Sequence, residues 1–514
     1  MKTFRFVAMI LLCETVALLR LAAAEPPPAG FTDITRESGI GAALDEHYKQ
    51  DTNWWLSGLN LVDLDGDGKL DLFFSAHGAG TALAVLNDGK GHFTKAKGSW
   101  PTTEIHLACD INEDGKLDLQ MTWQDGGGRW WMNESIPGEL RFRMSDMIAG
   151  QARANAMIDI NRDGKIDWLH ERPGIVFELG DGKGKFTKGG NLEIAATKNE
   201  INVHPVDLNG DGLIDLVVHW GRYDFEKGRS RIYMNTSGDS PPPSSGERAG
   251  VRGQLTFTNA TGTAGLVEEG LAIKGIGDLN HDGFPDLLVL EQKKPELYLN
   301  DGSGHFRKSP GALTGMEQAS QPRYVSWGLA VVTDFDNDGL PDILWNGRNF
   351  LWLLRGTADG HFAYMNKVWG IEDKSAASVD DGLCFGDIDG DGDLDIIGYT
   401  GNLDHQRKVK VYRNDLPAQN WLRVRPIGAA GNRAAAGAKI WITEPDAQAK
   451  IIAFEQVMIL DSQSAHSYYT YATTERHFGL GQRKKADVRV EFYPSGKRVE
   501  KKAVGVDSTV IVEE

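Results

Sequence analysis

Cysteine is scarce in this chain: Cys13, Cys109 and Cys384 are the three cysteines among 514 residues. Cys109 and Cys384 each stand just before an acidic segment, in repeats that are far apart in the sequence, so we expect no disulfide between them. A small disulfide-stapled fold is therefore excluded. A chain of this length is expected to form two domains or one large repeat architecture.

Long hydrophobic runs are also lacking. Beyond the N-terminus no stretch approaches the ~18 apolar residues that a membrane helix needs, so we expect no membrane insertion and a soluble protein. The first residues combine Lys2 and Arg5, an apolar run that ends at Cys13, and three alanines that end at Ala24, which is the order of a secretory signal peptide. We predict a signal peptide over residues 1–24 and a secreted protein, extracellular or periplasmic. An uncleaved anchor or a disordered tail is the alternative.

Positive charge is in deficit, with 55 Lys and Arg against 72 Asp and Glu and a formal net charge of -17. Such a balance argues against nucleic acid or an anionic membrane surface as a partner. Much of the acidic excess is clustered at fixed spacing. Clustered carboxylates repel one another unless a cation lies among them, so a metal is the first candidate.

One acidic motif, Asp-x-Asp/Asn-x-Asp-Gly-x-x-Asp, occurs seven times. Successive copies start 47, 49, 48, 71, 56 and 53 residues apart, which is the period of a four-stranded propeller blade. The copies begin at Asp63, Asp110, Asp159, Asp207, Asp278, Asp334 and Asp387.

A second element follows several of these loops: an apolar strand, a glycine-rich turn and an aromatic residue, as in LNDGKGHF from Leu86 and LNDGSGHF from Leu299. These are hairpin signals. Each repeat therefore predicts strand, acidic loop, strand, strand, glycine turn and strand, with almost no room for helices. We predict an all-β fold, a seven-bladed β-propeller over residues 30–415.

Ring closure gives an independent expectation. The segment Phe31 to Thr35 resembles the outermost strand of later repeats, yet no acidic loop precedes it, whereas the last repeat lacks a strand after Asn414. We predict that this N-terminal segment supplies the fourth strand of the last blade and removes two exposed edges. The long 71-residue interval contains the loop-like stretch Thr236 to Gln254 and not an eighth blade.

The acidic loops predict calcium sites. Positions 1, 3, 5 and 9 offer side-chain oxygens, position 7 offers a backbone carbonyl, and glycine at position 6 allows the sharp turn. Histidine and cysteine are absent from these positions, which argues against zinc, and magnesium would prefer stricter octahedral geometry. The bidentate glutamate of an EF-hand is also absent from position 12.

We expect about seven calcium ions, one for each loop. The predicted ligands are Asp63, Asp65, Asp67, Lys69 and Asp71; Asp110, Asn112, Asp114, Lys116 and Asp118; Asp159, Asn161, Asp163, Lys165 and Asp167; Asp207, Asn209, Asp211, Leu213 and Asp215; Asp278, Asn280, Asp282, Phe284 and Asp286; Asp334, Asp336, Asp338, Leu340 and Asp342; and Asp387, Asp389, Asp391, Asp393 and Asp395.

These loops and their hairpins resemble the FG-GAP or VCBS repeats of integrin-like and bacterial extracellular propellers. Beyond them, NWLRVRPIG from Asn420, GNRAAAGAKIWI from Gly431 and RHFGLG from Arg476 resemble the ASPIC/UnbV domain. The pairing is similar to the cartilage acidic protein family and its bacterial relatives, although Tyr493 stands where that domain usually has tryptophan. The resemblance implies a secreted calcium-binding protein. We expect residues 416–514 to form a small β domain, similar to a sandwich.

The propeller face opposite the acidic loops is the expected ligand face. Aromatic plates with polar groups beside them suit sugar rings, although each tryptophan could equally serve blade packing. The candidates for this face are Trp54, His77, His106, Trp123, Arg153, His204, His219, Trp220, Trp327 and Tyr399.

Two functions from different classes remain open. The first is an extracellular binding, adhesion or scaffold module for a glycan or protein ligand, with a monomeric chain expected. The second is a carbohydrate-active enzyme, a polysaccharide lyase or sugar dehydratase, that uses the ligand face for proton abstraction. No serine–histidine–aspartate order, phosphate loop or paired glutamate motif favours catalysis, so we assign no catalytic residue.

Overall fold

The structure is a computed structural model, and the predicted signal peptide lies outside the residues that it describes. Within residues 30–514 the described part excludes 78–80, 99–103, 123–127, 149–155, 172–173, 195–200, 221–228, 238–254, 268–270, 292–293, 320–328, 348–349, 372–378, 401–407, 446–449 and 461–474. Among the described residues, no helix has the length and apolar character to cross a membrane.

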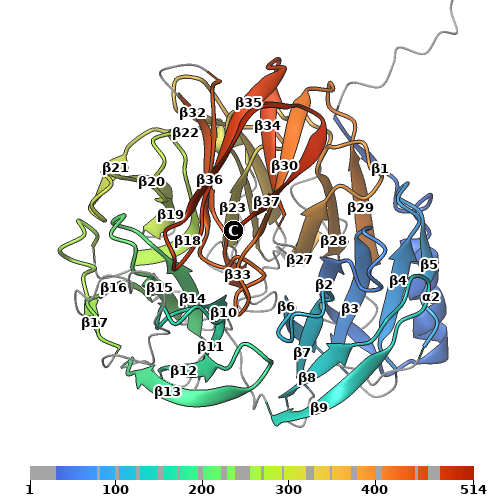
Figure 1. Ribbon diagram of the computed structural model, residues 1–514. Coiled ribbons are helices and arrows are strands. Elements are labelled where there is room, and N and C mark those ends of the chain that lie inside the picture. The colour runs from blue at the N-terminus through green and yellow to red at the C-terminus, as the bar shows by residue number, and fades with distance from the viewer. Residues whose placement is uncertain are drawn as a thin grey trace, which may run out of the picture.

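Seven sheets follow the repeats along the chain, and in six of them the four strands of the repeat lie side by side, antiparallel and in sequence order. Figure 1 shows them around a common centre, with the first strand innermost and the fourth at the periphery. Six of them contain β2(Trp55–Val62), β3(Asp71–His77), β4(Leu83–Asn87) and β5(Phe93–Lys95); β6(Glu104–Cys109), β7(Asp118–Thr122), β8(Gly128–Asn133) and β9(Phe142–Ile148); β10(Ala156–Ile158), β11(Asp167–Glu171), β12(Ile175–Gly180) and β13(Phe186–Leu192); β14(Ile201–Val206), β15(Asp215–Trp220), β16(Arg229–Asn235) and β17(Phe257–Asn259); β18(Leu271–Gly277), β19(Asp286–Glu291), β20(Lys294–Asn300) and β21(Phe306–Ser309); and β23(Leu329–Thr333), β24(Asp342–Gly347), β25(Phe350–Gly356) and β26(Phe362–Tyr364).

The seventh sheet combines the two ends of the repeat region. It contains β27(Val379–Gly386), β28(Asp395–Thr400), β29(Lys408–Asn414) and the N-terminal strand β1(Phe31–Asp33). Phe31 pairs with Asn414 and Asp33 with Tyr412, so the closing-strand prediction is confirmed. The all-β class is confirmed as well, whereas the blade count and the domain boundaries stay predictions.

A helix covers the seam at which the ring closes, and the described part of the chain is otherwise almost all β, as expected. Helix α2(Ile40–Gln50) buries Ile40, Leu44 and Tyr48, spaced by four residues, against β4, β5 and β29. Spacing by about one helical turn places these side chains on one face. A short 3₁₀ helix, η1(Met316–Gln318), follows β22(Leu313–Thr314), which adds to the edge of the sheet of β23 to β26.

Apolar side chains fill the spaces between neighbouring sheets. Phe73 on β3, for example, packs in one cluster with Ile105 on β6 and Trp131 on β8. Cys109 and Cys384 are buried free thiols, as expected. Burial of this kind is the main favourable term that holds neighbouring blades together.

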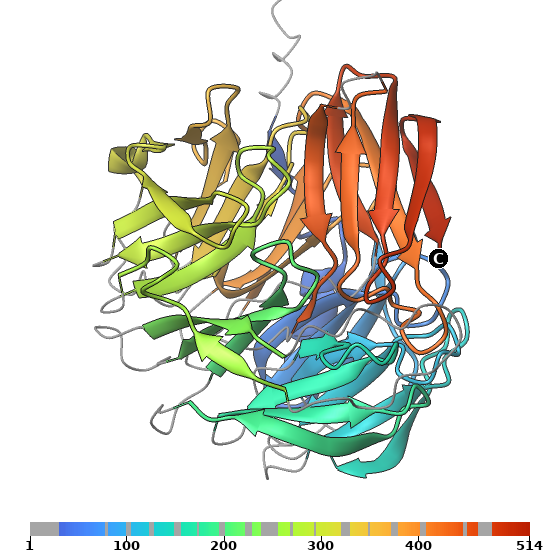
Figure 2. The ribbon, with the colours of Figure 1, turned by 60° about the vertical axis from the view of Figure 1, so that its left-hand side comes forward.

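The C-terminal segment forms two further sheets that pack face to face. One contains β30(Asn420–Ile427), β34(Arg476–Gly481) and β37(Ser508–Glu513), and the other β31(Lys439–Thr443), β32(Ile451–Gln456), β35(Lys485–Glu491) and β36(Arg498–Gly505). Their shared core includes Leu422, Ile440 and Val488, each fully buried. Figures 1 and 2 show this C-terminal domain lying across one end of the ring.

The C-terminal domain also reaches the centre of the ring. Its short strand β33(Ile459–Leu460) pairs with the innermost strand β10, with Ile459 opposite Met157 and Leu460 opposite Ala156. Figure 1 shows β33 near the centre, beside β10. Added to a strand edge inside the ring, this segment joins the two parts through main-chain hydrogen bonds.

Candidate metal centres

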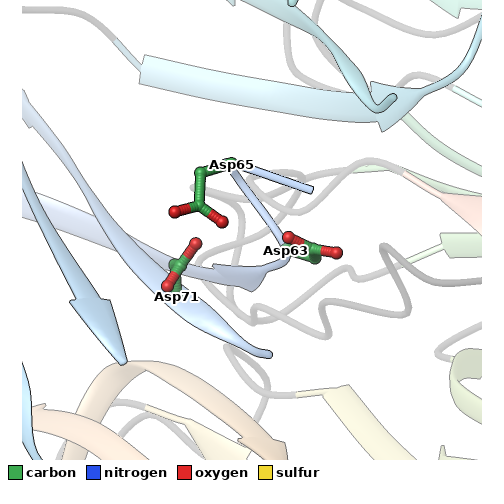
Figure 3. Close-up of side chains that lie close together, drawn as sticks. All are labelled: Asp63, Asp65 and Asp71. Atoms are coloured by element: carbon green, nitrogen blue, oxygen red, sulfur yellow. The ribbon is translucent and has the colours of Figure 1, made fainter. Parts of the chain in front are cut away.

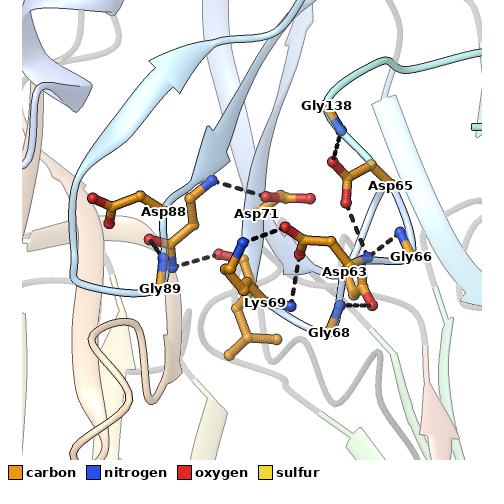
Figure 4. A network of polar contacts seen from close by, with 12 residues as sticks. Asp63, Asp65, Gly66, Gly68, Lys69, Asp71, Asp88, Gly89 and Gly138 are labelled. Carbon is orange, nitrogen blue, oxygen red and sulfur yellow. Dashed lines mark hydrogen bonds and ion pairs between the residues drawn. The ribbon is translucent and has the colours of Figure 1, made fainter. Parts of the chain in front are cut away.

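Each acidic loop connects the innermost strand of a sheet to the second one, and the ninth residue of the motif is the first residue of that second strand. In the first loop, Asp63 Oδ1 accepts a hydrogen bond from Gly66 N at 2.7 Å and Oδ2 accepts one from Gly68 N at 2.9 Å (Figure 4). Gly68 has a φ of 87°, in the left-handed region that glycine adopts most readily. The turn therefore holds the first carboxylate in a fixed orientation.

Three loops gather three carboxylates each. In the first loop, oxygens of Asp63, Asp65 and Asp71 all lie within 4.8 Å of one another (Figure 3). The same grouping occurs at positions 1, 3 and 9 of the sixth and seventh loops, in which the third residue is also aspartate. Oxygen-only clusters on a turn of this kind suit calcium. The two further clusters consist of Asp334, Asp336 and Asp342, and of Asp387, Asp389 and Asp395.

The ninth-position aspartates have a structural duty that the sequence prediction missed. Asp71 Oδ2 accepts a hydrogen bond from Leu64 N at 3.0 Å, and Oδ1 accepts one from Asn87 N at 2.9 Å. Each therefore ties its own loop to the following hairpin, while a carboxylate oxygen keeps a second lone pair for a cation. Equivalent pairs of bonds are made by Asp118, Asp167, Asp215, Asp286, Asp342 and Asp395.

The seventh residue of each loop positions the fifth. In the first loop, Lys69 N donates a hydrogen bond to Asp67 Oδ1 at 2.9 Å. The same bond, at 2.8–3.0 Å, is donated in the other loops by Lys116, Lys165, Leu213, Phe284, Leu340 and Asp393. Since this bond uses the amide, the carbonyl of the seventh residue stays available for the predicted role as a ligand.

Burial makes these carboxylates costly to ionise without a cation. Burial, followed by repulsion from neighbouring carboxylates, raises the pKa of Asp71 to about 7 and that of Asp286 to about 8. The pKa of Asp334 is raised well above its usual range for the same reasons. A divalent ion among the oxygens reverses this balance because opposite charge favours the ionised form. The donor set therefore fits calcium.

In four blades, an asparagine at the end of the third strand links the blade to the acidic loop of its neighbour. Asn87 Nδ2 donates hydrogen bonds to Leu70 O at 3.1 Å in its own blade and to Ile388 O at 2.8 Å in the last blade. The sequence signal for this bond is the asparagine that precedes the glycine-rich hairpin turn. Similar cross-blade bonds join Asn133 to Leu64, Asn300 to Leu208, and Asn414 to Phe335.

The C-terminal domain contacts the acidic loops directly. Lys439 Nζ lies 2.6 Å from Asp207 Oδ2, and the Arg423 guanidinium pairs with Asp387. Further along, His477 Nε2 lies 2.6 Å from Asn337 Oδ1. The end of the ring that carries the predicted calcium sites is thus the end that this domain covers. Sequence reasoning had no means to find these contacts, because they form between two domains and join residues 36, 140 and 232 positions apart.

Most candidates for the opposite face fall outside the described part of the chain. Trp123, Arg153 and Trp327 are not described, and only the backbones of His77, His106, Trp220 and Tyr399 are. Trp54 corrects the prediction: it is 1% exposed and packs edge-on against His47 and Tyr48 of α2, so no ligand can reach it. Its role is closure of the ring.

His204 on the innermost strand β14 is half-buried, and His219 on β15 and Lys274 on β18 are buried beside it. His219 Nδ1 is 2.9 Å from Ser230 Oγ, and Lys274 Nζ is 3.4 Å from His219 Nε2. Burial lowers the pKa of Lys274 to about 7 and that of His204 to about 4. His204 and Lys274 line a cavity of about 100 Å³, whereas ligand sites usually span about 300–1,000 Å³. A cavity of this size is smaller than an ordinary ligand site, so these three side chains fit a role in packing the ring interior better than a role in binding a substrate.

Comparisons with known proteins agree with this architecture. The FG-GAP-like repeat model matches residues 63–120, 278–328 and 334–398, and the ASPIC and UnbV model matches residues 428–514.

Three curated relatives share part of the chain. Cartilage acidic protein 1 of Homo sapiens is 28% identical over 276 residues, which is 51% of this chain and 39% of that protein. Cartilage acidic protein 1 of Xenopus tropicalis is 23% identical over 466 residues, 86% of this chain and 61% of that protein. Integrin alpha-6 of Homo sapiens is 28% identical over 207 residues, 38% of this chain and 15% of that protein. The match thus spans less than two thirds of the length of each relative. The chain thus combines segments that match the FG-GAP-like repeat model with a C-terminal segment that matches the ASPIC and UnbV model, and it is similar to the cartilage acidic proteins.

Proposed function

We propose that this protein is a secreted calcium-binding β-propeller that acts as an extracellular binding or adhesion module for a glycan or protein ligand. The observation that carries the proposal is the repeated loop geometry, in which buried carboxylates with raised pKa values converge at the same end of each blade. The resemblance to integrin and cartilage proteins supports an extracellular location.

Calcium has a structural part in this proposal. The ions would neutralise carboxylates that also anchor the hairpins, and asparagine bonds connect four loops, those that begin at Asp63, Asp207, Asp334 and Asp387, to the next blade. Loading one of these four loops would therefore stiffen two blades. With an ion in every loop the ring presents a rigid scaffold, and rigid scaffolds suit binding because little ordering free energy is lost on association.

Metal analysis of the dialysed protein tests the calcium part. Asp336→Ala removes one oxygen from the sixth loop and should lower the calcium content by about one ion per chain. Asp359→Ala is the matched control, since Asp359 lies in an exposed hairpin turn outside the loops. Equal calcium content in both variants and the parent chain would contradict the assignment of the sixth loop.

Glycan screening tests the binding part. The parent chain, loaded with calcium, is screened for binding and for new unsaturated products that would indicate a lyase. Trp123 and Trp220 remain predicted ligand contacts, so replacing both with alanine should weaken binding without changing calcium content. Detection of unsaturated products would contradict the proposal of a binding module and favour the alternative, a polysaccharide lyase.

A further inference from the structure

A large cavity lies between the ring and the C-terminal domain. Its volume is about 570 Å³, within the range of ordinary ligand sites. One wall consists of the acidic loops that begin at Asp63, Asp110 and Asp387, and the other wall includes Arg423, Arg425 and Arg433 of the C-terminal domain. It lies at the loop end of the ring and is therefore distinct from the predicted ligand face.

The cavity gathers cationic side chains from both walls. Arg425 Nη2 lies 3.0 Å from Glu475 Oε2, and Arg423 Nε lies 3.8 Å from Glu475 Oε1, so one glutamate serves two guanidinium groups. The exposed Arg433 side chain has no ion pair or hydrogen bond within the described residues. Lys69 and Lys116 add two amines from the loop wall.

The net charge of the cavity lining depends on whether the acidic loops hold calcium. Five acidic and five basic side chains line the cavity, so the walls balance while the loops are empty. Ions in the first, second and seventh loops would shift this balance by several positive charges. An ion beside Asp387 would also repel the Arg423 guanidinium, which pairs with that carboxylate. The lining side chains are Asp63, Asp88, Asp110, Asp387 and Glu475 against Lys69, Lys116, Arg423, Arg425 and Arg433.

The form of the walls indicates what fits. Aliphatic side chains of Leu61, Leu70 and Leu117 contribute apolar surface, and glycines of the loops also line the cavity. Apolar surface suits the C–H face of a sugar ring, while guanidinium groups bind carboxylates through two parallel hydrogen bonds. We propose that this cavity is a calcium-dependent site for a carboxylate-bearing oligosaccharide, in which Arg425 and Arg433 pair with uronate carboxylates. The inference rests on the calcium loading of the proposed function and adds a ligand class and a site.

Calorimetry on the full chain with trigalacturonate tests the site. With calcium present we expect binding, and Arg433→Gln and Arg425→Gln should each weaken it by about ten-fold, as expected for loss of a charge-assisted bidentate pair. Arg498→Gln is the matched control, because Arg498 is an exposed arginine of β36 that pairs with Glu491 and does not line the cavity. Neutral maltotriose should not bind.

The outcomes separate this inference from the proposed function. Binding that is unaffected by Arg433→Gln and Arg425→Gln, or equal for the neutral sugar, would overturn the site. Stronger binding of hexaglutamate than of trigalacturonate would overturn the saccharide assignment. If calcium content is normal and other glycans bind while trigalacturonate does not, this inference fails and the proposed function stands. If the protein takes up no calcium, both the oligosaccharide site and the proposed calcium-binding function are contradicted.

Discussion

The bond network around Asn87 permits a quantitative prediction. Asn87 is 5% exposed, and its side-chain amide nitrogen donates hydrogen bonds to the carbonyls of Leu70 and Ile388. Its side-chain oxygen accepts a third bond from Gly89 N at 3.0 Å. Asn87→Ala removes all three bonds and leaves two carbonyls at the seam between the first and last blades without this donor.

A buried polar group that loses its partner costs about 1–3 kcal/mol. Leu70 O loses its partner in this way, whereas Ile388 O keeps a hydrogen bond from Gly91 N at 2.9 Å. With about 0.5–1.5 kcal/mol for each of the other two lost bonds, the expected loss in the free energy of unfolding is about 2–6 kcal/mol. Urea titration of the calcium-loaded chain, followed by tryptophan fluorescence, measures it through the shift of the midpoint. The control is Asn191→Ala on β13, where the asparagine is exposed and the change should stay within about 0.5 kcal/mol. A loss below about 1 kcal/mol for Asn87→Ala would refute the idea that these asparagines join the blades.

Two further predictions concern the contacts that sequence reasoning missed. Trp54→Ala should destabilise the chain by about 3–5 kcal/mol, measured by the same titration, because it empties the buried space beneath α2; an effect near zero would contradict its role in ring closure. Lys439→Met leaves Asp207 without its cationic partner, so calcium should matter more: the difference in Tm between calcium and chelator should exceed that of the parent chain. Lys501→Met, an exposed change on β36, should leave that difference unaltered, and an equal response of both variants would contradict the contact.

The periodic features of the fold could be predicted from sequence because they are local. The aspartate motif fixes where each second strand begins, and the strand without a preceding loop at Phe31 indicated how the ring closes. Helix α2 was missed although Ile40, Leu44 and Tyr48 have helical spacing, since the repeat pattern left no place for it. The helix packs against β4, β5 and β29, where the first and last blades meet, and the repeat pattern contains no information about this junction.

The candidate site was predictable only in part. Aspartates at fixed spacing identify a metal loop from within nine residues. The partner of Lys439 on Asp207 lies 232 residues away, and the partner of Asn87 on Ile388 lies 301 residues away. No local pattern carries such pairs, because they arise when the ring closes and the C-terminal domain docks. The cavity between the ring and the C-terminal domain could not be predicted from the sequence for the same reason.

The measurement that tests the central claim most directly is thermal melting with and without calcium, combined with metal analysis. A dissociation constant near 10⁻⁴ M and about 2 mM free calcium give about 1.8 kcal/mol for each site, or about 12 kcal/mol for seven. That sum approaches the whole stability of a typical domain. The account predicts about seven ions in the loaded chain and a sharp fall in Tm when excess chelator removes them. An unchanged melting curve, with calcium shown to be absent, would contradict it.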